Sequence, residues 1–199
     1  MSKGNFQTII GSIDTPDVRT WDSEVAKTLG IPEDIGSDED CLASLLILPS
    51  FHPEFGIHIN AMPNGARLRF VTQGTNLWGW GCFQRMVANR KWRPDQPAPS
   101  APIFYSEDQF VLNERLFEYQ NFLKHSAPER VGCPFAVADG IRVVAEWRSI
   151  SGCIVRGDSN GPNDPTTFEV AHHGVTLALS LMKSEQSIGI LRDAIKYFN

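Results

Sequence analysis

The chain of 199 residues lacks several features that identify common classes of protein. It has no run approaching the ~18 uninterrupted apolar residues of a transmembrane helix. Its first residues carry one lysine and no sustained apolar run, so no secretory signal is predicted. It also contains no P-loop, no Gly-x-Gly-x-x-Gly sequence and no Gly-x-Ser-x-Gly elbow. These absences predict a cytoplasmic protein with no membrane segment and no cofactor, and a function other than that of an enzyme.

Cysteine is scarce and widely spaced. The four cysteines are Cys41, Cys82, Cys133 and Cys153, and no two of them form a Cys-x-x-Cys pair. A structural zinc site usually draws its ligands from closely spaced pairs, so this spacing argues against one. We therefore expect these cysteines to be reduced thiols of the core.

Basic residues are outnumbered by acidic ones. The chain has 18 Lys and Arg against 23 Asp and Glu, which gives a formal net charge of −5. Proteins that bind nucleic acid usually present a basic face, so no nucleic-acid partner is predicted. Five acids crowd the segment 33–40 with no base among them: Glu33, Asp34, Asp38, Glu39 and Asp40. The segment is either a solvated loop or an acidic surface for a basic protein partner.

Alternating hydrophobicity predicts several strands. The segment 42–48 is almost continuously apolar, as in a strand that is buried on both faces. Alternating apolar residues on either side of Asn64-Gly65 predict a hairpin from Phe55 to Thr72. Another strand is expected within 141–150, with successive side chains on opposite faces. One face would then carry Val143, Ala145 and Trp147, and the other Arg142, Val144, Glu146 and Arg148.

Helical spacing of apolar residues predicts four helices, at 17–29, 106–125, 165–183 and 187–198. Further short strands are expected at 6–13, 134–138 and 153–157, and the Trp-Gly repeat at 78–81 also suggests a strand. The predicted fold class is α+β, a mainly antiparallel sheet of about six to eight strands packed by four helices. We expect a single domain, 1–199, with a lobe boundary at the proline-rich crossing 93–103.

One short motif suggests an alternative, enzymatic function. His52-Pro53-Glu54 matches the His-x-Glu half of the zinc nucleobase deaminase signature, but the Pro-Cys-x-x-Cys half is absent. With His58 nearby, the alternative is a metal-assisted hydrolase or deaminase-like enzyme with His52, Glu54 and His58 as metal ligands. The other interpretation is a histidine in a turn and a histidine on the polar side of a strand.

Trp78 and Trp80 alternate with glycines that would let another chain approach closely. They are candidates for partner binding together with the acids of 33–40. A third interpretation makes them the homomeric interface of a structural subunit, for example in a homodimer.

Segment 139–182 resembles small bacterial α+β proteins of unknown function and immunity proteins of polymorphic toxin systems. The resemblance lies in Asp139-Gly140, Glu146, Ser151-Gly152 and Asn163-Asp164-Pro165, the last leading through Phe168 into a helix. It implies a protein that binds a cognate toxin and neutralises it without chemistry of its own. The leading interpretation is thus a cytosolic immunity protein whose partner is a cognate protein toxin.

Overall fold

A computed structural model describes residues 18–32, 34–91, 95, 97–126 and 140–199. Its centre is one antiparallel sheet of six strands in the order β4-β3-β2-β1-β5-β6. The strands are β1 (Cys41–Pro49), β2 (Phe55–Met62), β3 (Gly65–Thr72), β4 (Tyr105–Leu112), β5 (Ile141–Arg148) and β6 (Ile154–Asn160). The predicted α+β fold with an antiparallel sheet is confirmed.

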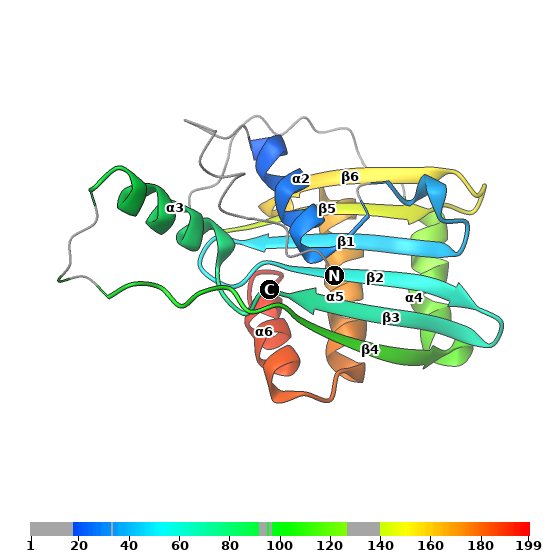
Figure 1. Ribbon diagram of the computed structural model, residues 1–199. Helices are drawn as coiled ribbons and strands as arrows, with labels where there is room; N and C mark the ends of the chain where they lie inside the picture. The colour runs from blue at the N-terminus through cyan, green and yellow to red at the C-terminus, as the bar shows by residue number, and fades with distance from the viewer. Residues whose placement is uncertain (1–17, 33, 92–94, 96, 127–139) are drawn as a thin grey trace.

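Helices cover both faces of the sheet, as Figure 1 shows. The described helices are α2 (Val18–Leu29), α3 (Leu77–Ala88), α4 (Asn113–His125), α5 (Pro165–Leu181) and α6 (Glu185–Ile195), with short 3-10 turns η1 (Ile35–Ser37) and η2 (Gly161–Asn163). Helices α4, α5 and α6 lie on one face and α2 on the other, while α3 projects beyond the end of the sheet (Figure 1).

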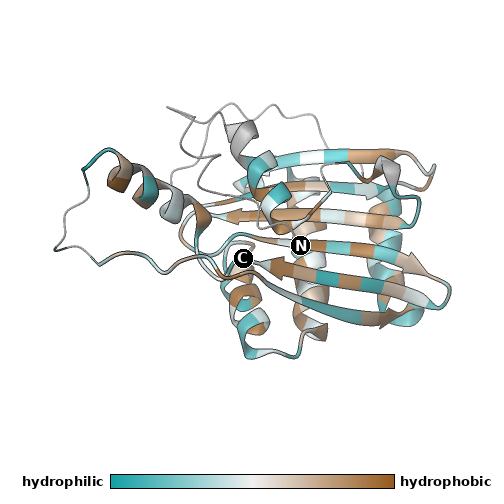
Figure 2. Cartoon of the chain, in the orientation of Figure 1, coloured by the Kyte–Doolittle hydropathy of each residue, from teal (hydrophilic) through white to brown (hydrophobic). Residues whose placement is uncertain are grey.

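The alternation of side chains along each strand gives two apolar layers. The main core joins one face of the sheet, including Leu45, Ile57 and Trp147, to α4, α5 and α6. A smaller cluster packs Val25 and Leu29 of α2 on the opposite face. Burying one such side chain fully is worth about 1.5–3 kcal/mol, so the larger layer contributes most of the stabilisation. Figure 2 shows this apolar character along the central strands and α5.

Most predicted elements match the structure. The hairpin from Phe55 to Thr72 is formed by β2 and β3, and the helices predicted at 17–29, 165–183 and 187–198 correspond to α2, α5 and α6. The alternation predicted for 141–150 also holds, because Val143, Ala145 and Trp147 are core residues while Arg142, Val144 and Glu146 face the α2 side. The strands predicted at 6–13 and 134–138 lie outside the described residues.

The helix predicted at 106–125 is wrong in its first third. Residues 105–112 form β4, which pairs with β3 along its whole length, and α4 begins only at Asn113. Ser106 and Gln109 have the spacing of a helix capping box, but both lie in β4 and cap no helix. Pairing with an available sheet edge overrides this local signal, since ladder hydrogen bonds satisfy the same backbone groups.

The strand suggested at 78–81 is a helix instead. Its start is fixed by two side chains: Asn76 Oδ1 accepts a hydrogen bond from the Gly79 N–H at 2.6 Å, and Glu54 Oε2 accepts one from the Leu77 N–H. Capping at both places satisfies helix donors that would otherwise lack partners. The glycines are therefore tolerated within α3 rather than marking a strand.

Candidate functional site

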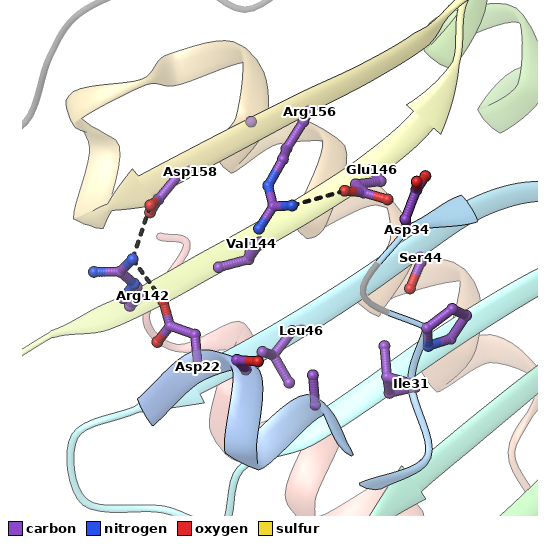
Figure 3. A pocket seen from close by; sticks show the side chains of 14 residues that line it. Asp22, Ile31, Asp34, Ser44, Leu46, Arg142, Val144, Glu146, Arg156 and Asp158 are labelled. Atoms are coloured by element: carbon purple, nitrogen blue, oxygen red, sulfur yellow. Dashed lines mark hydrogen bonds and ion pairs between the residues drawn. The ribbon is translucent and has the colours of Figure 1, made fainter. Parts of the chain in front are cut away.

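The most distinctive feature of the α2 face is a cavity of about 600 Å³ between α2, the residues Ile31, Pro32 and Asp34 that follow it, and the strands β1, β5 and β6. Figure 3 shows its lining side chains converging from these elements. The cavity exists because α2 packs on Leu46, Leu48 and Val71 through its apolar stripe and leaves the neighbouring strands only partly covered. We call it the α2 pocket.

Charged and apolar side chains both line the α2 pocket. The charged ones are Asp22, Asp34, Arg142, Glu146, Arg156 and Asp158, so carboxylates outnumber guanidinium groups by two. The apolar ones include Ala26, Ile31, Leu46 and Val144. The pocket thus combines an apolar floor with an excess of negative charge.

One nitrogen atom of Arg142 contacts carboxylates from two other elements. Its Nη2 lies 2.6 Å from Oδ2 of Asp22 on α2 and 2.8 Å from Oδ2 of Asp158 on β6 (Figure 3). Arg142 itself is on β5, so this bridge fixes α2 against two strands. The contact with Asp22 is largely shielded from solvent, whereas the side chain of Asp158 is 47% exposed, so screening weakens the second contact.

Asp22 is a buried carboxylate whose pKa is shifted by its surroundings. The residue is only 8% exposed, and its Oδ1 has no hydrogen-bond partner in the described part of the chain; the same holds for Nε of Arg142. Burial raises the pKa of Asp22 to about 7, and the repulsion of Asp158 adds to this, although the attraction of Arg142 opposes it. An unpaired buried carboxylate oxygen is costly, since burial removes water without supplying a donor.

Glu146 connects the pocket to the acidic segment. Its Oε2 accepts a hydrogen bond from the Ile35 N–H at 3.0 Å, and its Oε1 accepts one from Arg156 Nη1 at 3.1 Å. Arg148, two residues further along β5, donates to the carbonyl oxygens of Cys41 and Asp38 at 2.9 and 2.8 Å. Side chains of β5 therefore hold η1 and the turn that follows it in place.

A row of polar side chains crosses the sheet on the same face. Ser44 of β1 stands opposite His58 of β2 on one side and Glu146 of β5 on the other, and Glu146 stands opposite Arg156 of β6. The row continues in the other direction to Arg69 of β3. The sheet residues on this face are thus polar where α2 does not cover them.

The acids predicted to bind a partner divide into two groups. Asp34 Oδ1 accepts from the Gly36 N–H at 2.6 Å, and Asp38 accepts from the Asp40 N–H and from Asn60 Nδ2, so these two shape the turns. Glu39 and Asp40 are exposed. Glu33 lies outside the described residues. Asp34 also lines the α2 pocket, which places the acidic segment at the pocket's border.

The structure gives His52, Glu54 and His58 separate partners. His52 Nδ1 lies 2.8 Å from the Tyr197 hydroxyl, and Glu54, 2% exposed, accepts from the Leu77 N–H. His58 Nε2 lies 3.9 Å from Asp38, and burial lowers the pKa of this histidine although Asp38 opposes the effect. Within the described ranges, no three His, Cys, Asp or Glu side chains are arranged to hold a metal ion.

The two tryptophans lie on α3, away from the acidic segment. Trp80 is half-buried, and its ring centroid lies 5.3 Å from that of Phe83 on the same helix. The side chain of Trp78 lies outside the described part of the structure. Helix α3, which carries both tryptophans, projects beyond one end of the sheet (Figure 1).

Sequence reasoning missed Asp22, Arg156 and Asp158 as pocket residues. Part of the signal was present, because Arg156 lies in the strand predicted at 153–157 and Asp158 is two positions further on, on the same face of the longer strand β6. The position of Asp22 could not be inferred, however, since nothing in the sequence indicated that α2 lies above β5 and β6.

Among the described helices, none combines the length and the apolarity needed to cross a membrane. No family model, curated protein or solved structure matches the chain.

Proposed function

We propose that this chain is a cytosolic binding protein for a basic protein partner. The main support is the position of the exposed acids Glu39 and Asp40. They belong to the acidic segment 33–40, which borders a pocket rich in carboxylates, and Asp34 is part of the segment and of the pocket lining. Such a surface attracts a basic partner over a distance, raising the association rate more than the final affinity. Binding, rather than catalysis, is the activity that this arrangement supports best.

The proposed partner is a cognate bacterial toxin, which the protein neutralises as an immunity protein. This part of the proposal depends on the resemblance of segment 139–182 to immunity proteins. Glu146 and the Asn163-Asp164-Pro165 cap belong to that segment, and Glu146 lines the α2 pocket. An immunity protein blocks its toxin by covering it, so it needs a complementary surface but no reactive group.

Charge reversal tests the acidic surface. We expect Glu39→Lys with Asp40→Lys to slow association with the partner about tenfold at low ionic strength, because steering depends on unscreened charge. The partner is first captured on the tagged protein from the source organism, and rates are then measured by biolayer interferometry. The control is Glu114→Lys with Glu118→Lys, an equal change at exposed sites of α4 on the opposite face.

Function is tested by co-expression. A chain that restores growth to cells producing the captured partner is an immunity protein. The proposal fails if no protein is captured, if the adjacent gene is plainly metabolic, or if the variant with Glu39→Lys and Asp40→Lys associates as fast as the unaltered chain at low salt.

A further inference from the structure

Helix α3 is anchored to the protein by its first turn. Leu77 is fully buried in the smaller apolar cluster, and the side chains of Glu54 and Asn76 accept hydrogen bonds from the first backbone N–H groups of the helix. The helix then runs away from the sheet, past the ends of the strands (Figure 1). Its later turns therefore stand at the margin of the molecule.

An apolar stripe runs along these later turns. Trp80, Phe83 and Val87 follow one another at spacings of three and four residues, and Met86 adjoins them, so the four side chains share one side of the helix. The ring centroids of Trp80 and Phe83 lie 5.3 Å apart. Met86 is 38% exposed and Val87 is 45% exposed, and neither belongs to the two apolar clusters of the described chain. We call these four residues the α3 stripe.

Cations follow the α3 stripe directly. The segment 85–93 contains four Lys and Arg and no acid, and two of these cations, Arg90 and Lys91, are exposed just after the last turn. Their N–H groups donate to the carbonyl oxygens of Val87 and Met86 at 3.0 and 2.8 Å, which closes the helix. Arg90 has a φ of 55°, where glycine is the usual residue at a helix end. An arginine there keeps a cation at the tip of α3 at a cost in backbone strain.

The charge of the chain is divided between the two ends of the sheet. Glu39 and Asp40 directly precede the first residue of β1, whereas Asn76, just before α3, binds the carbonyl oxygen of Pro49 at its last residue. The nine residues of β1 span roughly 30 Å, more than three times the screening length of about 8 Å at physiological salt. No Asp or Glu occurs in residues 55–94. An acidic chain thus has one locally cationic end.

We propose that the α3 stripe and the cations Arg90 and Lys91 form a contact site for the surface of an anionic lipid bilayer. This goes beyond the proposed function, because two exposed cations would repel a basic protein partner. The contact is peripheral, since α3 has 12 residues and a helix that crosses a bilayer needs about 20.

The chemistry of this end of the molecule matches the layers of a membrane surface. Aromatic and aliphatic side chains of an interfacial helix enter the boundary between headgroups and acyl chains, and tryptophan is enriched at that depth. Arginine and lysine beside them attract anionic headgroups. A nucleic acid would leave Met86 and Val87 unused, because aliphatic side chains offer no plane on which a base can stack. A projecting helix also reaches an extended flat surface before the rest of the chain does (Figure 1).

The test is co-sedimentation of the purified full chain with lipid vesicles. One set of vesicles is phosphatidylcholine alone, and the other is an equal mixture of phosphatidylcholine and phosphatidylglycerol. We expect at least tenfold stronger partitioning onto the anionic vesicles at low ionic strength, and loss of most of this preference in about 0.5 M salt. Tryptophan emission should shift to shorter wavelength on binding and be quenched by lipids that carry bromine on the acyl chain.

Replacing the two cations tests the electrostatic part of the contact. Arg90→Gly with Lys91→Gln should weaken partitioning onto anionic vesicles at least tenfold. Glycine accepts the φ of 55°, so this variant should fold at least as stably as the unaltered chain. The matched control is Lys27→Gln with Lys124→Gln, which removes the same charge at exposed sites of α2 and α4 and should bind like the unaltered chain.

Replacing exposed residues of the α3 stripe tests the apolar part. Met86→Ser with Val87→Ser should weaken partitioning at least fivefold, because less apolar surface then enters the bilayer. The matched control is Phe117→Ser with Ile150→Ser, which removes two exposed apolar side chains elsewhere on the molecule and should bind like the unaltered chain. Thermal unfolding of each variant confirms that it is folded.

Several results would overturn the proposal. They are equal partitioning onto the two kinds of vesicle, no partitioning onto anionic vesicles up to about 1 mM lipid, and equal losses in the variants and their controls. Light scattering supplies another: if the unaltered chain is a dimer that Met86→Ser with Val87→Ser dissociates, the α3 stripe is an interface between copies. None of these measurements uses the captured partner, so their failure is distinct from failure of the immunity proposal.

Discussion

At the scale of single residues, two opposing effects act on the ionised form of Asp22 beside Arg142. The bridge from Arg142 to Asp22 and Asp158 stabilises the contact between α2 and the sheet, while burial of Asp22 destabilises its charged form. Because the desolvation is the larger effect, the pKa of Asp22 lies well above its ordinary value of 3.8. A residue that only served stability would be better as a neutral or apolar side chain.

The protonation of Asp22 makes the stability of the protein depend on pH. Between pH about 4 and about 7, the folded chain binds more protons at this residue than the unfolded chain does, so the free energy of unfolding falls as the pH rises. We expect urea unfolding between pH 4 and pH 7 to show this decline in the free energy of unfolding. Asp22→Asn, which removes the titrating group, should remove much of the decline. Each unit of raised pKa corresponds to about 1.4 kcal/mol.

The control for this measurement is Asp193→Asn. Its hydrogen bond from Lys196 lowers the pKa of Asp193, so this exposed group contributes no decline in the same interval. A decline that persists unchanged in the Asp22→Asn variant would show that another group titrates between pH 4 and pH 7.

At the scale of elements, Glu107 connects the edge strand β4 to the start of α6. Its carboxylate accepts hydrogen bonds from the Lys183 N–H and from Ser187 Oγ, both at 2.7 Å. Burial opposes ionisation of Glu107, but the donors from Ser187, Lys183, Gln109 and Ser184 prevail and lower its pKa to about 2. An edge strand that has neighbours on one side only gains an anchor in this way.

Replacing Glu107 tests this anchor. Glu107→Gln should lower the free energy of unfolding by about 1–2 kcal/mol at pH 7, because two or more charge-assisted hydrogen bonds are lost. The lowered pKa implies that the contribution is present above pH about 4.5 and is lost as the pH falls towards 2. Urea unfolding at pH 7 and pH 3 measures the destabilisation and its dependence on pH. The control is Glu114→Gln, at an exposed position of α4. Equal destabilisation at the two pH values would exclude the ionic contribution.

At the scale of the whole molecule, the sheet is shared by both helical layers. Leu45 and Ile47 of β1 face α4, α5 and α6, while Leu46 and Leu48, alternating with them, pack against α2. Loosening β1 therefore disturbs both apolar clusters at once. Along β5, side chains on one face belong to the main core, and the alternating side chains on the other face line the α2 pocket.

This sharing predicts that the chain unfolds as one cooperative unit. We expect the urea transitions followed by tryptophan fluorescence and by far-ultraviolet circular dichroism to coincide. Leu45→Ala, which removes a fully buried side chain, should lower the free energy of unfolding by about 2–5 kcal/mol and shift both transitions equally. A separate early transition would instead support a second lobe beyond the proline-rich crossing 93–103.

The sequence by itself determined the fold class and most of the elements. Period-2 alternation around Asn64-Gly65 specified the β2–β3 hairpin, and alternation in 141–150 separated the core residues from Arg142, Val144 and Glu146. These patterns are local, since the face that a side chain occupies follows from its position along one strand. Local signals failed at residues 105–112 and 78–81, where strand pairing and the caps from Glu54 and Asn76 decided the outcome.

Only the tertiary structure decided which charged residues meet. Asp22 and Arg142 lie 120 positions apart in the printed sequence, yet one carboxylate oxygen and one guanidinium nitrogen lie 2.6 Å apart. Their encounter depends on α2 crossing the face of the sheet that Arg142 occupies, which is a long-range contact that no local pattern encodes. The sequence showed that the chain is acidic, and the tertiary structure placed four of its carboxylates in the lining of one pocket.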